Sequence, residues 1–137
     1  MTAMTETIEN RVLDEMFGGA TFARPAAWCL GLLTAAPGDT TTGTEVSTVG
    51  TGYSRATSPN TTAHWNNAAS GAKANATTIT FPTASGANWG TITHMAFYDT
   101  TASNATMWFY SALTASKVVN VGDVVRFTSG SITLTAS

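Results

Sequence analysis

The side chains that most often catalyse reactions or bind metals are few in this 137-residue chain. It has two histidines, His64 and His94, and one cysteine, Cys29, which together provide no zinc-binding spacing. Asp99 and Asp123 each adjoin turn residues, where an Asp side chain usually bonds to nearby backbone. No Gly-x-Ser-x-Gly motif, phosphate-binding loop or dinucleotide fingerprint occurs. We therefore predict that the protein is not an enzyme and needs no metal or cofactor.

The aromatic residues allow a binding function instead. Trp65 lies in a polar stretch, residues 61–67, and has two interpretations. It folds back as a lid on the core, or it stays exposed as an anchor for a partner or a glycan, with Tyr53 as a second stacking platform. The candidate interface residues from the whole chain are Ile8, Val12, Met16, Tyr53, Arg55, His64 and Trp65.

Charge is scarce, and this excludes several classes of partner. Charged residues make up 10% of the chain, against about 25% in ordinary soluble domains, and the net charge is −2. A nucleic-acid partner and a polybasic membrane contact both need a basic patch, so neither is expected. No apolar run approaches the roughly 20 residues of a membrane span, and no secretory signal is predicted, so we expect synthesis in a host cytoplasm. The lone Cys29 allows no internal disulfide, and its apolar neighbours predict that it is buried.

One helix is predicted, over residues 5–17. Ile8, Val12 and Met16 lie on one apolar stripe, and Gly18-Gly19 ends the segment. The stripe packs either on the body of the domain or on a neighbouring subunit. We accordingly divide the chain into an N-terminal arm and helix, residues 1–19, and a single β-sandwich domain, residues 20–137.

After Pro25 the chain alternates between apolar and polar residues, as β-strands do. In residues 89–99 this places Ile92, His94, Ala96 and Tyr98 on one face. The last two segments are joined by Ser129-Gly130-Ser131, which predicts a hairpin. The predicted strands are 26–33, 53–57, 77–81, 89–99, 107–113, 117–119, 124–127 and 132–134, with long loops at 38–52 and 58–76. The fold expected is a mainly β, antiparallel, jelly-roll-like sandwich with one short N-terminal helix.

The predicted core takes the large apolar residues of these strands. Its members are Trp28, Leu30, Leu32, Phe81, Trp89, Phe97, Phe109, Leu113, Phe127 and Leu134.

Several stretches, taken in order, carry a family resemblance. They are residues 13–19, 22–32, 34–37, 52–55, 79–82, 89–94, 113–117 and 121–123. From about Ile8 to its C-terminus the chain resembles a family of small virion proteins of tailed bacteriophages, of the tail-fibre-like or head-decoration type. The resemblance implies a non-enzymatic structural protein that is located in the virion.

Two functions are compatible with that resemblance. The first is a capsid decoration or cement protein that binds the major capsid protein or other virion proteins and its own copies, with a trimer as the expected homo-oligomer. The alternative is a tail-fibre or spike component that contacts host surface glycans. Both use a nearly neutral surface rich in hydroxyl groups, which tolerates close packing of copies.

Overall fold

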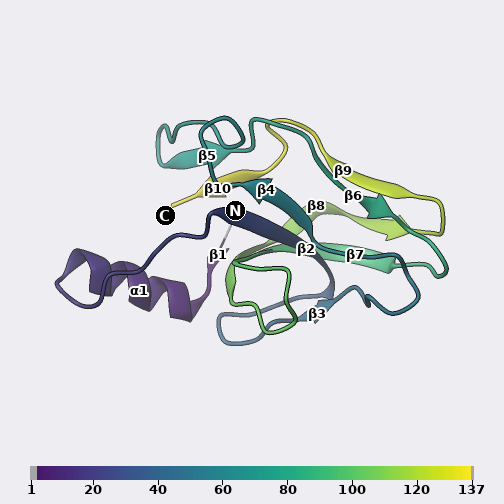
Figure 1. Ribbon diagram of the computed structural model, residues 1–137, viewed down its shortest axis with the longest axis horizontal. Coiled ribbons are helices and arrows are strands. Elements are labelled where there is room, and N and C mark those ends of the chain that lie inside the picture. The colour runs from purple at the N-terminus through teal and green to yellow at the C-terminus, as the bar shows by residue number, and fades with distance from the viewer. Residues whose placement is uncertain (1–2, 137) are drawn as a thin grey trace.

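Within residues 3–136, which the computed structural model describes, the chain forms one helix and ten strands (Figure 1). The helix is α1 (Glu6–Met16), within the predicted range. The strands are β1 (Ala3–Met4), β2 (Ala27–Ala35), β3 (Thr44–Glu45), β4 (Ala56–Pro59), β5 (Ala72–Ala74), β6 (Ile79–Thr83), β7 (Gly90–Tyr98), β8 (Met107–Val119), β9 (Val124–Phe127) and β10 (Thr133–Thr135). No helix in this part of the chain is long and apolar enough to cross a membrane.

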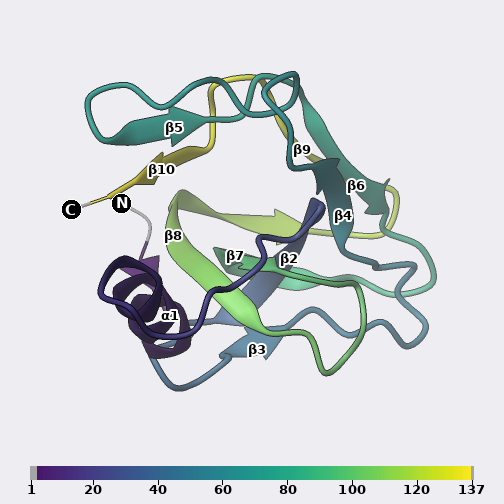
Figure 2. The same cartoon turned by 60° about the vertical axis from the view of Figure 1, so that its left-hand side comes forward.

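Six strands form the main antiparallel sheet, in the order β1-β8-β7-β2-β3, and β4 also pairs with β2. Two ribbons of two strands each, β5 with β10 and β6 with β9, make up the rest. In Figures 1 and 2 these ribbons lie over the main sheet as a second layer. The prediction of a mainly β fold with packed antiparallel sheets and one N-terminal helix is therefore confirmed, although the second layer is divided.

The pairing of the last strands corrects the prediction. Segments 107–113 and 117–119 are one strand, β8, which stays continuous because register shifts let it bend along β7. The segments predicted as a hairpin do not pair with each other, since β9 pairs with β6 and β10 pairs with β5. The turn between them is present and is closed by a bond from the Ser131 N–H to the Thr128 carbonyl. It therefore carries the chain from one ribbon to the other.

Two strands extend past their predicted ends at 57 and 81 to include a proline, and two predicted loops contain short strands. Pro59 is the last residue of β4, and Pro82 lies inside β6 at its register shift against β9. A strand tolerates proline at an end or a bulge, where no ladder hydrogen bond is lost. The loops expected at 38–52 and 58–76 contain the short strands β3 and β5, which pair with β2 and β10.

The strand β7 does not alternate along its whole length. Ile92 packs in the main core, whereas Ala96 and Tyr98 belong to a second cluster on the opposite face of the sheet. The change falls at the register shift between Ile92 and His94, where the irregular pairing with β8 interrupts the regular ladder and re-aims the side chains. Strict alternation placed these four residues together and was wrong for Ile92.

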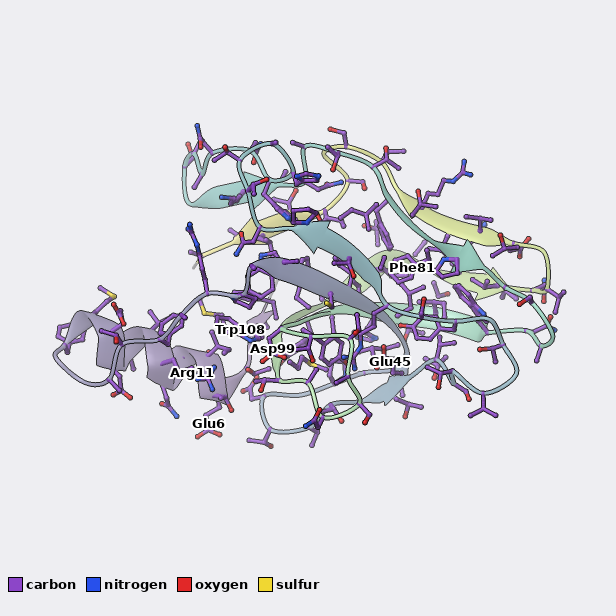
Figure 3. The ribbon with its side chains drawn as sticks, in the orientation of Figure 1. Glu6, Arg11, Glu45, Phe81, Asp99 and Trp108 are labelled. Atoms are coloured by element: carbon purple, nitrogen blue, oxygen red, sulfur yellow. The ribbon has the colours of Figure 1, made fainter. Side chains whose placement is uncertain are left out.

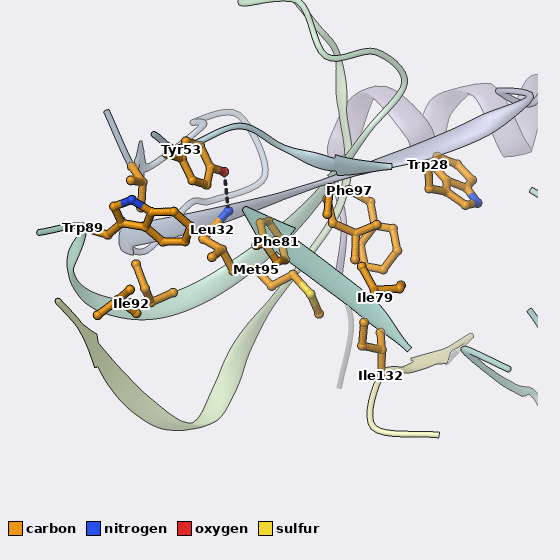
Figure 4. Packing of buried hydrophobic residues seen from close by; sticks show 14 of the residues in the cluster. Trp28, Leu32, Tyr53, Ile79, Phe81, Trp89, Ile92, Met95, Phe97 and Ile132 are labelled. Carbon is orange, nitrogen blue, oxygen red and sulfur yellow. Dashed lines mark hydrogen bonds between the residues drawn. The ribbon is translucent and has the colours of Figure 1, made fainter. Parts of the chain in front are cut away.

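The main core lies between the sheet and the ribbons (Figure 4). Aromatic rings pack edge to face there: the Trp28 ring centroid is 5.3 Å from that of Trp108 and 6.1 Å from that of Phe97. The predicted core residues Trp28, Leu30, Leu32, Phe81, Trp89 and Phe97 are buried. The other four, Phe109, Leu113, Phe127 and Leu134, are only partly buried because they lie at its edge. Missed members include Ile8, Tyr53, Trp65, Ile79, Ile92, Met95, Trp108 and Ile132.

The N-terminal segment is joined to the main sheet. Strand β1 pairs with β8, and the Thr5 N–H and hydroxyl donate to the carbonyls of Trp108 and Met107. Ile8 is 1% exposed in the main core, and the Arg11 guanidinium lies over the Trp108 ring (Figure 3). The start of α1 thus packs on the body of the protein. The domain boundary at residue 19 stays a prediction.

Candidate binding surface

Arg55, a predicted interface residue, is the centre of an internal polar cluster. Its Nε and Nη2 donate to the two carboxylate oxygens of Glu45 at 2.9 and 2.8 Å. Its Nη1 donates to the carbonyls of Thr100 and Ala102 at 2.9 and 3.0 Å. The guanidinium carbon lies 3.6 Å from the centroid of the Tyr98 ring. Arg55 therefore ties β3 to the loop that leads into β8, and its three nitrogens are all engaged within the chain.

Tyr53 belongs to the same cluster and is only 4% exposed. Its hydroxyl donates to Glu45 Oε1 at 2.8 Å and accepts the Leu32 N–H at 2.9 Å (Figure 4). Gly31 makes room for the cluster, because a Cβ there would lie 2.8 Å from both the Glu45 carboxylate and the Tyr98 ring. The hypothesis that Tyr53 is a glycan-stacking platform is corrected: its ring is in the core.

Burial and the Glu45 carboxylate together control ionisation in this cluster. Burial, with the negative charge of Glu45, raises the pKa of Tyr98 to about 12 and raises the pKa of Tyr53 still further. Burial opposes the charge of Arg55, but the hydrogen bond and charge of Glu45 outweigh it and raise the Arg55 pKa. At neutral pH the cluster is one ion pair beside two neutral phenols.

Trp65 is a lid on the core, which confirms the first of its two interpretations. It is 1% exposed, and its ring centroid lies 5.6 Å from that of Phe97. An isolated bridge to Asn75 holds its stretch in place. The neighbouring His64 is half-buried, with Nδ1 3.0 Å from the Thr61 hydroxyl. Trp65 therefore offers no exposed aromatic face, so the hypothesis of Trp65 as a glycan anchor is corrected as well.

The helix stripe separates into a docked start and an exposed end. Ile8 is buried and Val12 packs partly on the core, whereas Met16 is 69% exposed. Leu13 and Phe17 are also largely exposed beside it. We call Leu13, Met16 and Phe17 the helix-end patch. It lies at the free end of α1, which projects from the body in Figure 1.

A groove lies between the main sheet and the β6–β9 ribbon, where β8 and β9 do not pair. This β8–β9 groove has a volume of about 650 Å³. It is lined by Ser111–Ala115 and Lys117 of β8, 124–127 of β9, 131–133 of the following segment, and Met95 and Phe97 of β7. Met95, Phe97 and Ile132 are buried at its base, as the labelled side chains in Figure 4 help to locate. The groove exists because β8 pairs with β7 while β9 pairs with β6, which leaves the two strands unjoined.

The lining of the groove combines hydroxyl groups with two cations. Ser111, Thr114, Ser131 and Thr133 supply the hydroxyls, and Lys117 and Arg126 supply the charge. Among the described residues, no His, Cys, Asp or Glu lines it. The Ser111 and Ser131 hydroxyls donate to the carbonyls of Ala112 and Thr128, and a hydroxyl oxygen that donates can also accept. Polar groups placed around an apolar base are typical of a site that binds a polar ligand.

None of the candidate interface residues lies in this groove, and sequence reasoning did not single out Lys117 or Arg126. The available signal was a run of small hydroxyl residues around each cation, in segments 111–117 and 124–133. Recognising a site from these residues also required knowing that the two segments face each other in the fold. No three His, Cys, Asp or Glu side chains within residues 3–136 are grouped as a metal site.

Comparison with models of known protein families gives a match over nearly the whole chain. A family model described as "Podophage GP4 fiber I protein gp80" matches residues 3–135. No curated protein matches the sequence.

Proposed function

The chain belongs to the podophage GP4 fiber I protein gp80 family of tailed-phage virion fibre proteins, and from this membership we propose that it is a tail-fibre component that binds host surface glycans through the β8–β9 groove. Membership makes it a virion component and implies a non-enzymatic structural role. It favours the fibre function over the capsid-cement function, which rested on size, β content and composition that both kinds of protein share.

The observation that carries the glycan proposal is the groove. Its 650 Å³ are large enough for one or two sugar units, and pockets that bind small ligands commonly have about 300–1,000 Å³. Hydroxyl-rich walls match the hydrogen-bonding groups of a saccharide, and partly exposed Phe127 offers an apolar face beside them. Because glycoside hydrolysis ordinarily uses a pair of carboxyl groups and the described lining has none, we propose binding without cleavage.

We also propose that the other end of the molecule makes contacts within the virion. The helix-end patch exposes three apolar side chains in a protein that must attach to other virion proteins or to further copies of itself. Figure 1 places α1 at one end and the ribbon of β6 and β9 at the other. This separation would let one molecule attach and recognise the host at the same time.

The glycan proposal is tested by host-cell binding of the purified chain. Thr114→Trp fills the groove with a bulky ring at an exposed position, and Thr42→Trp makes the same exchange in the exposed loop before β3. We expect the wild type and Thr42→Trp to bind host cells and to compete with phage adsorption, and Thr114→Trp to bind about tenfold less or worse. Equal binding by both variants, or no binding by the folded wild type, would refute the proposal.

A further inference from the structure

We propose that the β8–β9 groove selects anionic saccharides, those that carry carboxylate or phosphate groups. This inference rests on the proposed glycan binding and adds the chemical class of the ligand.

The first argument is the segregation of charge. The chain has six Lys and Arg residues and eight Asp and Glu residues. Both charged residues that line the groove, Lys117 and Arg126, are cations. A groove whose charges share one sign attracts ligands of the opposite sign, even in a protein with a net charge of −2.

The second argument is that these cations are available. Within residues 3–136 the one ion pair joins Arg55 to Glu45, so neither Lys117 nor Arg126 is neutralised by a carboxylate. Both side chains are exposed along the groove wall. By contrast, the paired guanidinium of Arg55 has all its nitrogens bonded inside the chain.

The third argument is where the acidic residues are. Four of them, Glu6, Glu9, Asp14 and Glu15, belong to α1, at the end of the molecule away from β9 (Figure 1). The acid that is nearest in sequence to the groove, Asp123, accepts the Asn120 N–H at 2.9 Å within its own turn. No acid of the described chain is therefore among the residues that line the groove.

The two cations would act differently on a bound anion. The planar guanidinium of Arg126 can donate two parallel hydrogen bonds to one carboxylate or phosphate, whereas the ammonium of Lys117 acts as a compact charge. Because both lie in contact with solvent, their attraction is screened by salt, with a Debye length of about 8 Å at physiological ionic strength. Binding should therefore weaken as salt is added.

The test is calorimetric titration of the full chain with three oligosaccharides of equal length: a galacturonate oligomer, a phosphate-bearing oligomer and a neutral galactose oligomer. We expect at least one anionic oligomer to bind about tenfold more tightly than the neutral one, and the preference to shrink between about 0.05 and 0.5 M salt. The first two ligands distinguish carboxylate from phosphate as the recognised group. Equal affinity for all three would overturn the inference.

Two double variants with the same net charge locate the effect. Lys117→Ala/Arg126→Ala removes the groove cations, and Arg24→Ala/Lys73→Ala removes two cations outside it. We expect the first to lose about tenfold or more in affinity for the anionic oligomer and the second to keep wild-type affinity. Equal losses in both would mean that net charge, not the groove, attracts the ligand, which would overturn the inference.

Host-cell binding by the same variants separates this inference from the proposed function. If the wild type and Lys117→Ala/Arg126→Ala bind cells equally at low salt, glycan binding stands and anion selection fails. If the folded wild type binds no cells, the proposed function fails. If light scattering shows that the groove variant changes the number of subunits and leaves ligand binding unaltered, the groove is a contact between copies and both proposals fail.

Discussion

The two halves of β8 differ in what covers them. In the first half Met107 and Trp108 are buried, and β1 pairs with the edge that faces away from β7. In the second half residues 114–118 are exposed, and among the described strands only β7 pairs with this half. Lys117 and Val118 form those pairs, whereas residues 114–116 lie in the register shift between the paired Ala112 and Lys117. A strand covered on both edges supports the fold, while the same strand, covered on one edge, borders the groove. One strand therefore stabilises the fold in its first half and, in the function we propose, borders the ligand site in its second half.

Deleting residues 1–17 would remove the cover from the first half and should have the largest effect. It uncovers the β8 edge at Phe109 and Tyr110 and empties the core site of Ile8, whose loss alone is worth roughly 2–5 kcal/mol. We expect the truncated chain to melt at a much lower temperature and to aggregate, as seen by thermal melting and size-exclusion chromatography. A truncated chain that stays monomeric and melts like the full chain would break the comparison, and would mean that the arm serves assembly alone.

Trp108→Ala tests the covered half from within. The ring packs between Trp28 and Phe22 and is 4% exposed, so its loss should cost roughly 3–5 kcal/mol in the free energy of unfolding, measured in urea. Val118→Ala, in the open half at 56% exposure, should change that free energy by no more than about 0.5 kcal/mol. Similar losses at both positions would show that the halves do not differ in stability.

Arg55→Ala tests the loop that leads into the covered half. The substitution leaves Glu45 without its partner and releases the carbonyls of Thr100 and Ala102. Since the Arg55 side chain is 8% exposed and that of Glu45 is 24% exposed, we expect a loss of about 2–3 kcal/mol, below the range for fully buried pairs. Arg24→Ala, at an exposed position, is the control and should be neutral within about 0.5 kcal/mol. A neutral Arg55→Ala would mean that the loop does not depend on this cluster.

Alkaline pH provides a milder test of the same region, because Tyr98 lies opposite Met107 at the start of β8. Its pKa is raised from 10.0 to about 12 by burial and Glu45, so the folded protein binds this proton more tightly than the unfolded chain does. The contribution is fully present below pH 10 and is lost as the pH rises from 10 to about 12. We expect urea-unfolding free energies to fall over that range and to fall less steeply in Tyr98→Phe. An identical slope in the variant would remove Tyr98 as a cause.

Much of the fold followed from local patterns in the sequence. Residue periodicity located α1, β2 and β7 because helix and strand periods are visible within a dozen residues. Pairing could not be predicted in this way. The predicted hairpin of 124–127 and 132–134 failed because each segment pairs with a strand far earlier in the chain, β9 with β6 and β10 with β5.

The site was harder to predict for the same reason. Tyr53 and Arg55 read as surface residues until β3 brings Glu45 beside them. The groove depends on β8 and β9 having different partners, which no local pattern encodes. Lys117 and Arg126 become a pair of groove cations only in the folded chain.

The buried cysteine has a consequence for measuring motion. Cys29 is the single cysteine of the chain, is 4% exposed, and lies in β2 between Thr57 of β4 and Tyr98 of β7. A thiol-modifying reagent can reach its sulfur only after neighbouring strands separate, so the rate of modification under native conditions reports how often the centre of the sheet opens. The modification rate of Cys29 is thus a measure of sheet opening that needs no added label. Measuring the same rate before and after assembly into fibres would show how far neighbouring subunits slow that opening.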